Sequence, residues 1–327
     1  MKVLLVGDAA RQADRLRALL DDGTEVIALP REAGQSADFD GDVGPGDVVV
    51  SLRFVRPAGR MPRFALLHLP GAGLDGVDLD ALDPATAVCN VYEHEGPIAE
   101  YVLWAMLQHA LRPDRMRFAS AGWSDAHRSR LPHGELAGRT VGLFGFGRIG
   151  RAIAVRARAF GMRVATLDRP SLAGADAPVD LRVPADDLPA LLAASDFVVL
   201  CAPLDDTTRG RFGDAEFAAM RRDAVLVNVA RAEIVQEAAL HAALVGGRIA
   251  GAVLDVWYAY PAGADDRVAP SALPIADLPN VVATAHSSAW TDALPARRWR
   301  VIADNVRRLR DGRPLLNLVR GPRGART

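Results

Sequence analysis

The chain of 327 residues has little of several features that would assign a protein to a class at once. It has two cysteines, Cys89 and Cys201, each within an apolar run, which argues against a disulfide framework and indicates reduced thiols in the cytoplasm. The 39 Lys and Arg balance 40 Asp and Glu, so no basic field exists for nucleic acid or an anionic membrane. No run approaches the roughly 18 apolar residues of a membrane span. Small molecules are the expected partners.

Hydrophobic residues, in contrast, make up 50% of the chain, and charged residues 24%, which is typical of a globular protein. The length exceeds that of one ordinary domain, about 100 to 200 residues, and predicts two. In the first third, β-rich runs at 2–6, 47–50 and 64–68 accompany a helical pattern at 9–20. The apolar pattern of residues 98–111 predicts a long, mostly buried helix that ends before Pro113.

From residue 140 onward, strand-like and helix-like segments alternate regularly. Strands are expected in TVGLFG, MRVATLD, DFVVLCAP, AVLVNVA, IAGAVLDV and VVATAH, with helices from 149 and at about 186–194, 214–220 and 235–245 and a last amphipathic helix at about 292–311. Such alternation is typical of a parallel sheet that helices cover on both faces. We therefore predict an α/β fold with two doubly wound parallel-sheet domains and a cleft between them.

A glycine motif, GFGRIG, follows the strand that ends near residue 144 and opens a helix. Gly145 permits a tight turn, Gly147 lets the backbone approach a pyrophosphate, and Gly150 lets the helix sit close to the strand. The amides of Arg148 and Ile149 would face the phosphates at the positive helix end. The helix would bury one apolar face, formed by Ile149, Ala152, Ile153, Ala157 and Phe160.

An acidic residue, Asp168, ends the next strand, where a carboxylate can accept hydrogen bonds from the ribose hydroxyls of a dinucleotide. A carboxylate there repels a 2′-phosphate, so the sequence favours NAD over NADP. The adjacent Arg169 softens that preference. No metal is expected.

Several segments in order resemble the D-2-hydroxyacid dehydrogenase family. They are GFGRIG, CAPLDDTTRG, NVARAEIVQEAAL, GAVLDVW and NVVATAHSSAWT, preceded by LPGAGLDGVDLDAL and IAEYV. The resemblance implies a flavodoxin-like substrate domain at 1–97 plus 288–327 and a Rossmann NAD-binding domain at 98–287. It also implies a homodimer formed through the cofactor domain, for which the helix at 98–111 offers an apolar surface.

The resemblance also implies residue roles for hydride transfer between NAD and a small 2-hydroxy or 2-keto acid. Arg231 would anchor the substrate carboxylate, and His286 would be the acid/base. Cofactor contacts would come from Ala202, Pro203, Thr208, Val229, Ala230 and Asp255, the last at the nicotinamide amide, and substrate contacts from Ala72, Gly73, Tyr92 and His94. The other five histidines, at 68, 109, 127, 133 and 241, are interpreted as structural or exposed.

One position departs from the family pattern in a way that bears on the chemistry. In DVWYAYP, Tyr260 stands where most members have a glutamate whose carboxylate pairs with the histidine. A carboxylate favours a nearby cation by about 1 to 3 pKa units, and a neutral phenol cannot supply that. We therefore expect His286 to be a weaker base, with Tyr260 as its hydrogen-bonding partner.

Two alternatives stay open. In the first, the hydride donor is a small anion without a hydroxyl proton, as in formate dehydrogenases, which have a neutral glutamine at the corresponding place. In the second, the chain is a non-catalytic NAD-sensing binding protein. Retention of both Arg231 and His286 favours the enzyme over this second alternative.

Overall fold

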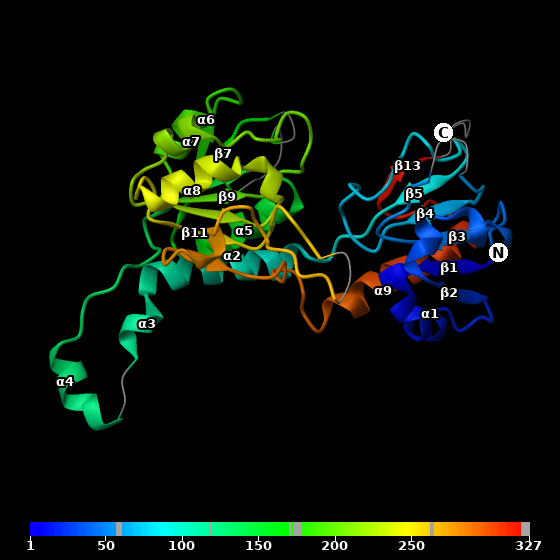
Figure 1. Ribbon diagram of the computed structural model, residues 1–327, viewed down its shortest axis with the longest axis horizontal. Helices are drawn as coiled ribbons and strands as arrows, with labels where there is room; N and C mark the ends of the chain where they lie inside the picture. Colours follow the sequence, from blue (N-terminus) through cyan, green and yellow to red (C-terminus); the bar gives the residue numbers. More distant parts are fainter. Residues whose placement is uncertain (57–60, 118–119, 170–171, 173–177, 262–264, 322–327) are drawn as a thin grey trace. The chain divides into compact units, whose positions relative to one another are not determined.

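The computed structural model describes residues 1–56, 61–117, 120–169, 172, 178–261 and 265–321. It divides the chain into two compact units (Figure 1): unit 1 is Met1–Glu93 with Thr291–Thr327, and unit 2 is His94–Trp290. The division lies just before helix α2, Glu95–Leu111. The domain boundary expected after residue 97 would fall inside the first turn of this helix.

Unit 1 is built on a six-stranded sheet with the order β13-β5-β4-β3-β1-β2. Its strands are β1 (Val3–Val6), β2 (Val26–Leu29), β3 (Val48–Val50), β4 (Leu66–His68), β5 (Ala87–Cys89) and β13 (Leu318–Arg320). All neighbours pair in parallel except β13, which runs antiparallel to β5. The order 2-1-3-4-5 is that of flavodoxin-like sheets.

Alternate residues of the unit 1 strands point to opposite faces, as the pleat requires. On one face, Val3 and Leu5 pack with helices α1 (Ala13–Leu20) and α9 (Leu294–Arg310) through Leu16 and Trp299. On the other face, Leu4 and Val6 pack under the 3₁₀ helices η2 (Arg31–Gly34) and η3 (Ala37–Asp42). The chain therefore buries both faces of this sheet.

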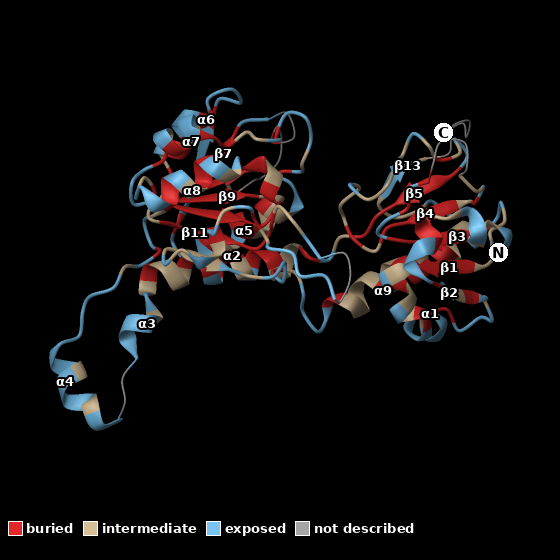
Figure 2. Ribbon diagram, in the orientation of Figure 1, coloured by how far each residue is buried: buried red, intermediate tan, exposed pale blue. Residues whose placement is uncertain are grey.

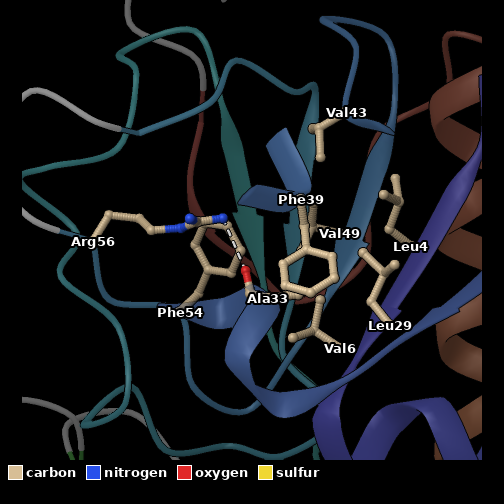
Figure 3. Close-up of a pocket in the computed structure, with 9 residues that line it drawn as sticks. All are labelled: Leu4, Val6, Leu29, Ala33, Phe39, Val43, Val49, Phe54 and Arg56. Atoms are coloured by element: carbon tan, nitrogen blue, oxygen red, sulfur yellow. Dashed lines mark hydrogen bonds between the residues drawn. The ribbon is translucent and has the colours of Figure 1, made fainter. Parts of the chain in front are cut away.

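The second face of the unit 1 sheet encloses a small cavity (Figure 3). Arg56 lies at its edge, with its guanidinium 5.2 Å from the centre of the Phe54 ring, and donates hydrogen bonds to Ala33 O at 2.8 Å and Asp40 Oδ1 at 2.7 Å. Desolvation raises the pKa of Asp40, and the Arg56 charge only partly offsets this. The space holds about one water at most and is otherwise walled by aliphatic and aromatic side chains, so it is a packing gap.

Unit 2 is built on a seven-stranded sheet with the order β12-β11-β10-β9-β6-β7-β8. Its strands are β6 (Thr140–Phe144), β7 (Arg163–Leu167), β8 (Leu181–Val183), β9 (Phe197–Leu200), β10 (Val225–Asn228), β11 (Gly251–Leu254) and β12 (Val281–Ala283). Every pair is parallel. The chain reverses its direction of progress between β6 and β9, which makes this point the topological switch of a doubly wound sheet.

Helices cover both faces of the unit 2 sheet. Helices α2 and α5 (Arg148–Ala159) pack on one face, and α6 (Leu188–Ala193), α7 (Asp214–Ala219) and α8 (Glu237–Val245) on the other. Figure 2 shows the central strands as buried and the outer sides of the helices as exposed. The segment after α2 carries α3 (Pro113–Met116), η4 (Ser120–Gly122) and α4 (Trp123–Arg128), none of which buries a residue.

The predicted α/β class and its two parallel sheets are confirmed. Within the predicted 9–20 helix, only Ala13–Leu20 is α-helical, because the chain first forms a 3₁₀ helix, η1 (Gly7–Gln12). Phe160 does not belong to the buried face of α5: the helix ends at Ala159, and the Phe160 side chain is 45% exposed. No helix in the described ranges is both long and apolar enough to cross a bilayer.

Candidate active site at the carboxyl edge of the unit 2 sheet

The predicted cofactor and catalytic segments of unit 2 all follow strands of one parallel sheet. Residues 145–150 follow β6, 168–169 follow β7, 202–208 follow β9, and 229–231 follow β10, while Asp255 and residues 284–288 follow β11 and β12. Because the strands are parallel, these segments lie along one edge. Ligands of open α/β sheets bind at this carboxyl edge, next to the switch point.

At two positions of the turn after β6, the surrounding backbone leaves no room for a side chain. Gly145 has φ +107°, and a Cβ there would lie 2.6 Å from the amide nitrogen of Ala202. A Cβ on Gly150 would lie 2.6 Å from Gly145 O. The thiol of Cys201 donates to Gly145 O at 2.9 Å, which ties the end of β9 to this turn.

Gly147 is different, because a Cβ there would meet nothing within 4 Å. It is the N-cap of α5, where no side chain caps the helix and the first turn has no acidic residue. The first amides of a helix lack intrahelical partners and attract anions. The bare turn therefore fits the pyrophosphate of a dinucleotide, with Arg148 and Ile149 as the first helical residues.

The remaining cofactor positions lie on either side of this turn. Asp168 and Arg169 are exposed at the end of β7, and the Asp168 amide donates to Val183 O at 2.6 Å. In the loop after β9, the Thr208 hydroxyl donates to Pro203 O at 2.8 Å and accepts from the Asp205 amide at 2.8 Å. Thr208 thus shapes the 203–208 loop through its hydroxyl.

The turn after β10 positions Arg231. The Asn228 side chain fixes this turn: Asn228 Oδ1 accepts from the Ala230 amide at 3.0 Å, and Asn228 Nδ2 donates to Arg231 O at 3.0 Å. Val229 and Ala230 are buried beneath the turn. Arg231 is partly buried, and its Nη1 donates to Ala230 O at 2.8 Å.

The segment after β12 places His286 on a bend in the left-handed region, with φ +54°. Asp255, which is 0% exposed, accepts at Oδ1 from Thr284 Oγ1 at 2.6 Å and from the Ser287 amide at 2.7 Å, and at Oδ2 from the Ser288 amide at 2.9 Å. These bonds flank His286 on both sides. They fix a backbone conformation that non-glycine residues rarely adopt and that clusters at functional sites.

Sequence reasoning missed this pinning role of Asp255 and its partners Thr284, Ser287 and Ser288. The available signal was the polar HSS that directly follows an apolar strand run. It identifies its carboxylate partner only when β11 and β12 are known to be neighbours.

The aromatic run after β11 places Tyr260 beside His286. The Tyr260 Oη lies 3.0 Å from His286 Nδ1, and it accepts from the Trp257 amide at 3.1 Å. Trp257 is buried and donates from Nε1 to Thr284 O at 2.8 Å, whereas Tyr258 donates to Val235 O at 3.0 Å. Trp257 and Tyr258 therefore anchor the loop, whereas Tyr260, which is 50% exposed, contacts His286.

Charges around the pair act on both titratable groups. Partial desolvation lowers the pKa of His286 from its usual 6.5, and the Arg231 charge adds to this, while Asp255 opposes it. Desolvation raises the pKa of Tyr260, with Asp255 and Glu233 adding to it, whereas the Trp257 amide and Arg231 oppose it. The Arg231 charge acts on the pKa of both groups, so the guanidinium lies near the imidazole and the phenol.

The predicted substrate residues are in two places. Ala72 and Gly73 follow β4 in unit 1, where Ala72 O accepts from Asn90 Nδ2 at 2.9 Å. Tyr92, also in unit 1, accepts at its carbonyl oxygen from Arg298 Nε at 3.2 Å. His94 is the first residue of unit 2 and is buried at the start of α2. Among the described residues, no group of three or more His, Cys, Asp and Glu is arranged to hold a metal ion.

Comparison with known proteins identifies the family. Residues 101–288 match the family described as "D-isomer specific 2-hydroxyacid dehydrogenase, NAD binding domain". The chain belongs to the D-isomer specific 2-hydroxyacid dehydrogenase family. The matched range lies within unit 2, so unit 2 is its nicotinamide dinucleotide-binding domain, in agreement with the bare glycine turn.

Relatives of known activity are dehydrogenases and reductases. The glyoxylate reductase of Korarchaeum cryptofilum is 33% identical over 264 residues, which are 79% of this chain and 76% of that protein. The D-3-phosphoglycerate dehydrogenase of Methanocaldococcus jannaschii is 32% identical over 77% of this chain, and the match spans only 47% of that protein. The structure of a 2-hydroxyacid dehydrogenase from Ketogulonicigenium vulgare Y25 superposes with a TM-score of 0.76 at 25% identity, covering 98% of both chains.

Proposed function

We propose that this protein transfers a hydride between a nicotinamide dinucleotide and a small 2-hydroxy or 2-keto acid. The observation that carries the proposal is the arrangement of Arg231, Tyr260 and His286. They follow three neighbouring strands, β10, β11 and β12, at the sheet edge that also holds the glycine turn. A guanidinium and an imidazole at such an edge are the groups that an α-keto acid needs for binding and proton transfer.

The cofactor, when bound, supplies or accepts the hydride. We assign its pyrophosphate to the turn formed by Gly145, Gly147, Arg148, Ile149 and Gly150, with the ribose near Asp168 and Arg169 and the rest along Ala202, Pro203, Thr208, Val229 and Ala230. The exposed Asp168 carboxylate favours NAD over NADP, because it repels a 2′-phosphate. The resemblance also assigns Asp255 to the nicotinamide amide; its carboxylate is 0% exposed and accepts three hydrogen bonds around the His286 bend, so a contact there needs that bend to move.

The substrate roles follow from the same chemistry. The Arg231 fork matches a carboxylate and the adjacent carbonyl oxygen, and His286 exchanges the proton of the hydroxyl group. We assign unit 1 as the substrate domain, in which the amides of Ala72 and Gly73 hold the carboxylate and Tyr92 contacts the substrate. His94, the first residue of unit 2, is assigned as a further substrate contact.

The test is an assay of the purified protein with NADH or NADPH and a panel of 2-keto acids that includes glyoxylate and hydroxypyruvate, and of formate with NAD. Reduction of a 2-keto acid, faster with NADH, supports the proposal. Turnover of formate alone would assign the site to a donor without a hydroxyl proton, which the neutral phenol at 260 also suits. Tight NADH binding without turnover of any substrate would identify a cofactor-sensing protein.

We also propose a homodimer formed through unit 2. Residues 113–131 expose Met116, Trp123 and Leu131, which are 46%, 53% and 73% exposed, and Trp104 on α2 is 42% exposed. A segment whose described residues are not buried and that exposes large apolar side chains is typical of an interface. Light scattering that gives the mass of two chains supports this, and loss of that mass in Trp123→Ser would locate the interface.

The two cysteines support a cytoplasmic location. Both thiols are free, and desolvation raises the pKa of each to about 12. Such thiols carry almost no thiolate at neutral pH and are unreactive packing groups.

A further inference from the structure

The hydrogen bonds around Tyr260 Oη contain information about the protonation of His286. The Trp257 amide can only donate, so Tyr260 Oη accepts that bond at 3.1 Å. The phenol proton then needs an acceptor. Among the described residues, the only one that Oη contacts is His286 Nδ1, at 3.0 Å.

We propose that Tyr260 donates its phenol proton to Nδ1 of His286, which holds the neutral ring as the tautomer with its proton on Nε2, and that this pair relays a proton to the substrate oxygen during reduction. The proposal rests on the proposed function and deepens it. A glutamate at 260 would impose the opposite tautomer, because a carboxylate accepts from an Nδ1 proton. Tyr260 is thus a positioning residue that sets which ring nitrogen faces the chemistry as a donor.

The charges around the pair favour a neutral ring. Desolvation and, to a smaller extent, Arg231 from the turn after β10 disfavour the imidazolium, and the buried Asp255 only partly offsets them. Glu233, from the 3₁₀ helix η6 (Ala232–Ile234), disfavours the phenolate, as does Asp255. Near pH 7 the resting pair therefore consists of an imidazole and a phenol, and a ready-made imidazolium is scarce.

The relay moves two protons toward the substrate oxygen and is then reset by one proton from solvent. As the carbonyl carbon of a 2-keto acid gains the hydride, its oxygen takes the Nε2 proton, and Nδ1 takes the phenol proton. The phenolate keeps the hydrogen bond from the Trp257 amide. After the product leaves, one solvent proton returns to Nε2 and Nδ1 gives its proton back to the phenolate. The transfer is favourable, because a phenol is a much stronger acid than an aliphatic alcohol, and the raised pKa of Tyr260 only narrows this difference.

With its proton on Nε2, the neutral ring can give a proton in reduction but cannot accept one at that nitrogen in oxidation. Oxidation of a hydroxy acid needs Nε2 without its proton, whereas the resting tautomer has that nitrogen protonated. Oxidation therefore needs a deprotonated phenol or the minor tautomer. We expect reduction to proceed near pH 7 and oxidation to rise only at alkaline pH.

The direct test is ¹⁵N NMR of histidine side chains in the full chain without ligand, with the His286 signals assigned by their loss in His286→Gln. The expected result is a proton on Nε2 in the wild type at neutral pH, a mixture of tautomers in Tyr260→Phe, and a proton on Nδ1 in Tyr260→Glu. A wild-type proton on Nδ1, or the same tautomer in wild type and Tyr260→Phe, overturns the proposal.

The kinetic test follows 2-keto acid reduction against pH. In Tyr260→Phe we expect about a tenfold or larger loss near neutral pH, with the remaining rate rising as pH falls through the pKa of His286, because only an imidazolium can then give the proton. In Tyr260→Glu the pKa of His286 rises by about one unit or more. Because the carboxylate also leaves Nε2 without its proton, oxidation should rise near that pKa, at a lower pH than in the wild type. Identical pH profiles in all three proteins overturn the relay. If no keto acid is reduced at all, the proposed function fails, and the NMR result still decides the tautomer.

Discussion

The two units have the same kind of sheet but different turns at its carboxyl edge. In unit 1, β1 runs into the 3₁₀ helix η1, whose first turn carries Asp8. In unit 2, β6 runs through Gly145 and Gly147 directly into the twelve residues of α5, with no acidic residue in the first turn. A carboxylate at the first turn repels phosphate, whereas bare amides attract it. Parallel topology therefore provides an edge for a ligand, and the chemistry of the turn decides whether a dinucleotide binds there.

The same contrast holds for two histidines. His68, the last residue of β4, is 0% exposed, and its ring contacts Leu69 O through Nδ1 at 3.2 Å and Asn305 Nδ2 through Nε2 at 2.9 Å. Its burial lowers its pKa to about 4. His286 is exposed on a left-handed bend, with one nitrogen held by Tyr260. A histidine at a strand end is a packing group when both nitrogens are used inside the protein, and a candidate acid/base when one faces outward.

The largest expected effect is on turnover, which should depend on His286 and not on His68. His286→Ala should lower the turnover of 2-keto acid reduction by about 10²-fold or more, because no other group takes over the proton transfer. His68→Gln should keep near-normal turnover at neutral pH in the fraction that is folded. The measurement is steady-state kinetics on both variants. Equal losses of turnover would remove the distinction between the two sites.

The next effect is on stability, because the buried His68 should make the unfolding free energy depend on pH. His68 is neutral when folded, and its folded pKa of about 4 lies below the usual 6.5, so its stabilisation is complete above about pH 6.5 and is lost as pH falls toward 4. Unit 1 should lose about 2 kcal/mol of unfolding free energy between pH 7 and pH 5 from this group alone. Urea unfolding at both values, compared with His68→Gln, measures it. An equally large loss in the variant would assign the pH dependence to other groups.

A smaller effect tests the glycine turn with a matched pair. Gly147→Ala places a Cβ in open space, so the thermal unfolding midpoint should not change. The NADH dissociation constant should rise about tenfold, because the Cβ keeps the pyrophosphate from the backbone. Gly145→Ala, at φ +107° and 2.6 Å from a backbone nitrogen, should instead lower stability by about 1 to 3 kcal/mol. Thermal unfolding and NADH fluorescence titration read the two quantities. If Gly147→Ala binds NADH normally, the pyrophosphate does not lie against that turn.

The sequence allowed prediction of features that depend on local spacing. The GFGRIG turn, the helix after it and Asp168 are recognisable because each follows from a few consecutive residues. In contrast, β2, β5, β8 and β13 were not predicted, and three of them, β2, β8 and β13, are partly exposed strands at sheet edges. Tyr260 was identified as a departure from a family pattern, and its two hydrogen bonds needed coordinates.

Long-range polar contacts could not be predicted either. Asp255 holds Thr284, Ser287 and Ser288 across 29 to 33 positions of sequence, because β11 and β12 are neighbours in the sheet. Asn305 reaches His68 in the same way, between α9 and β4. One sequence shows which polar residues exist, but the pairing of strands decides which of them meet.

The most direct test of the central claim is a crystal structure with NADH and a 2-keto acid or an unreactive analogue. We expect the pyrophosphate against Gly147 and Arg148, the carboxylate on the Arg231 guanidinium, and the carbonyl oxygen within hydrogen-bonding distance of His286 Nε2. A dinucleotide bound away from the glycine turn, or a substrate that contacts neither Arg231 nor His286, would contradict it.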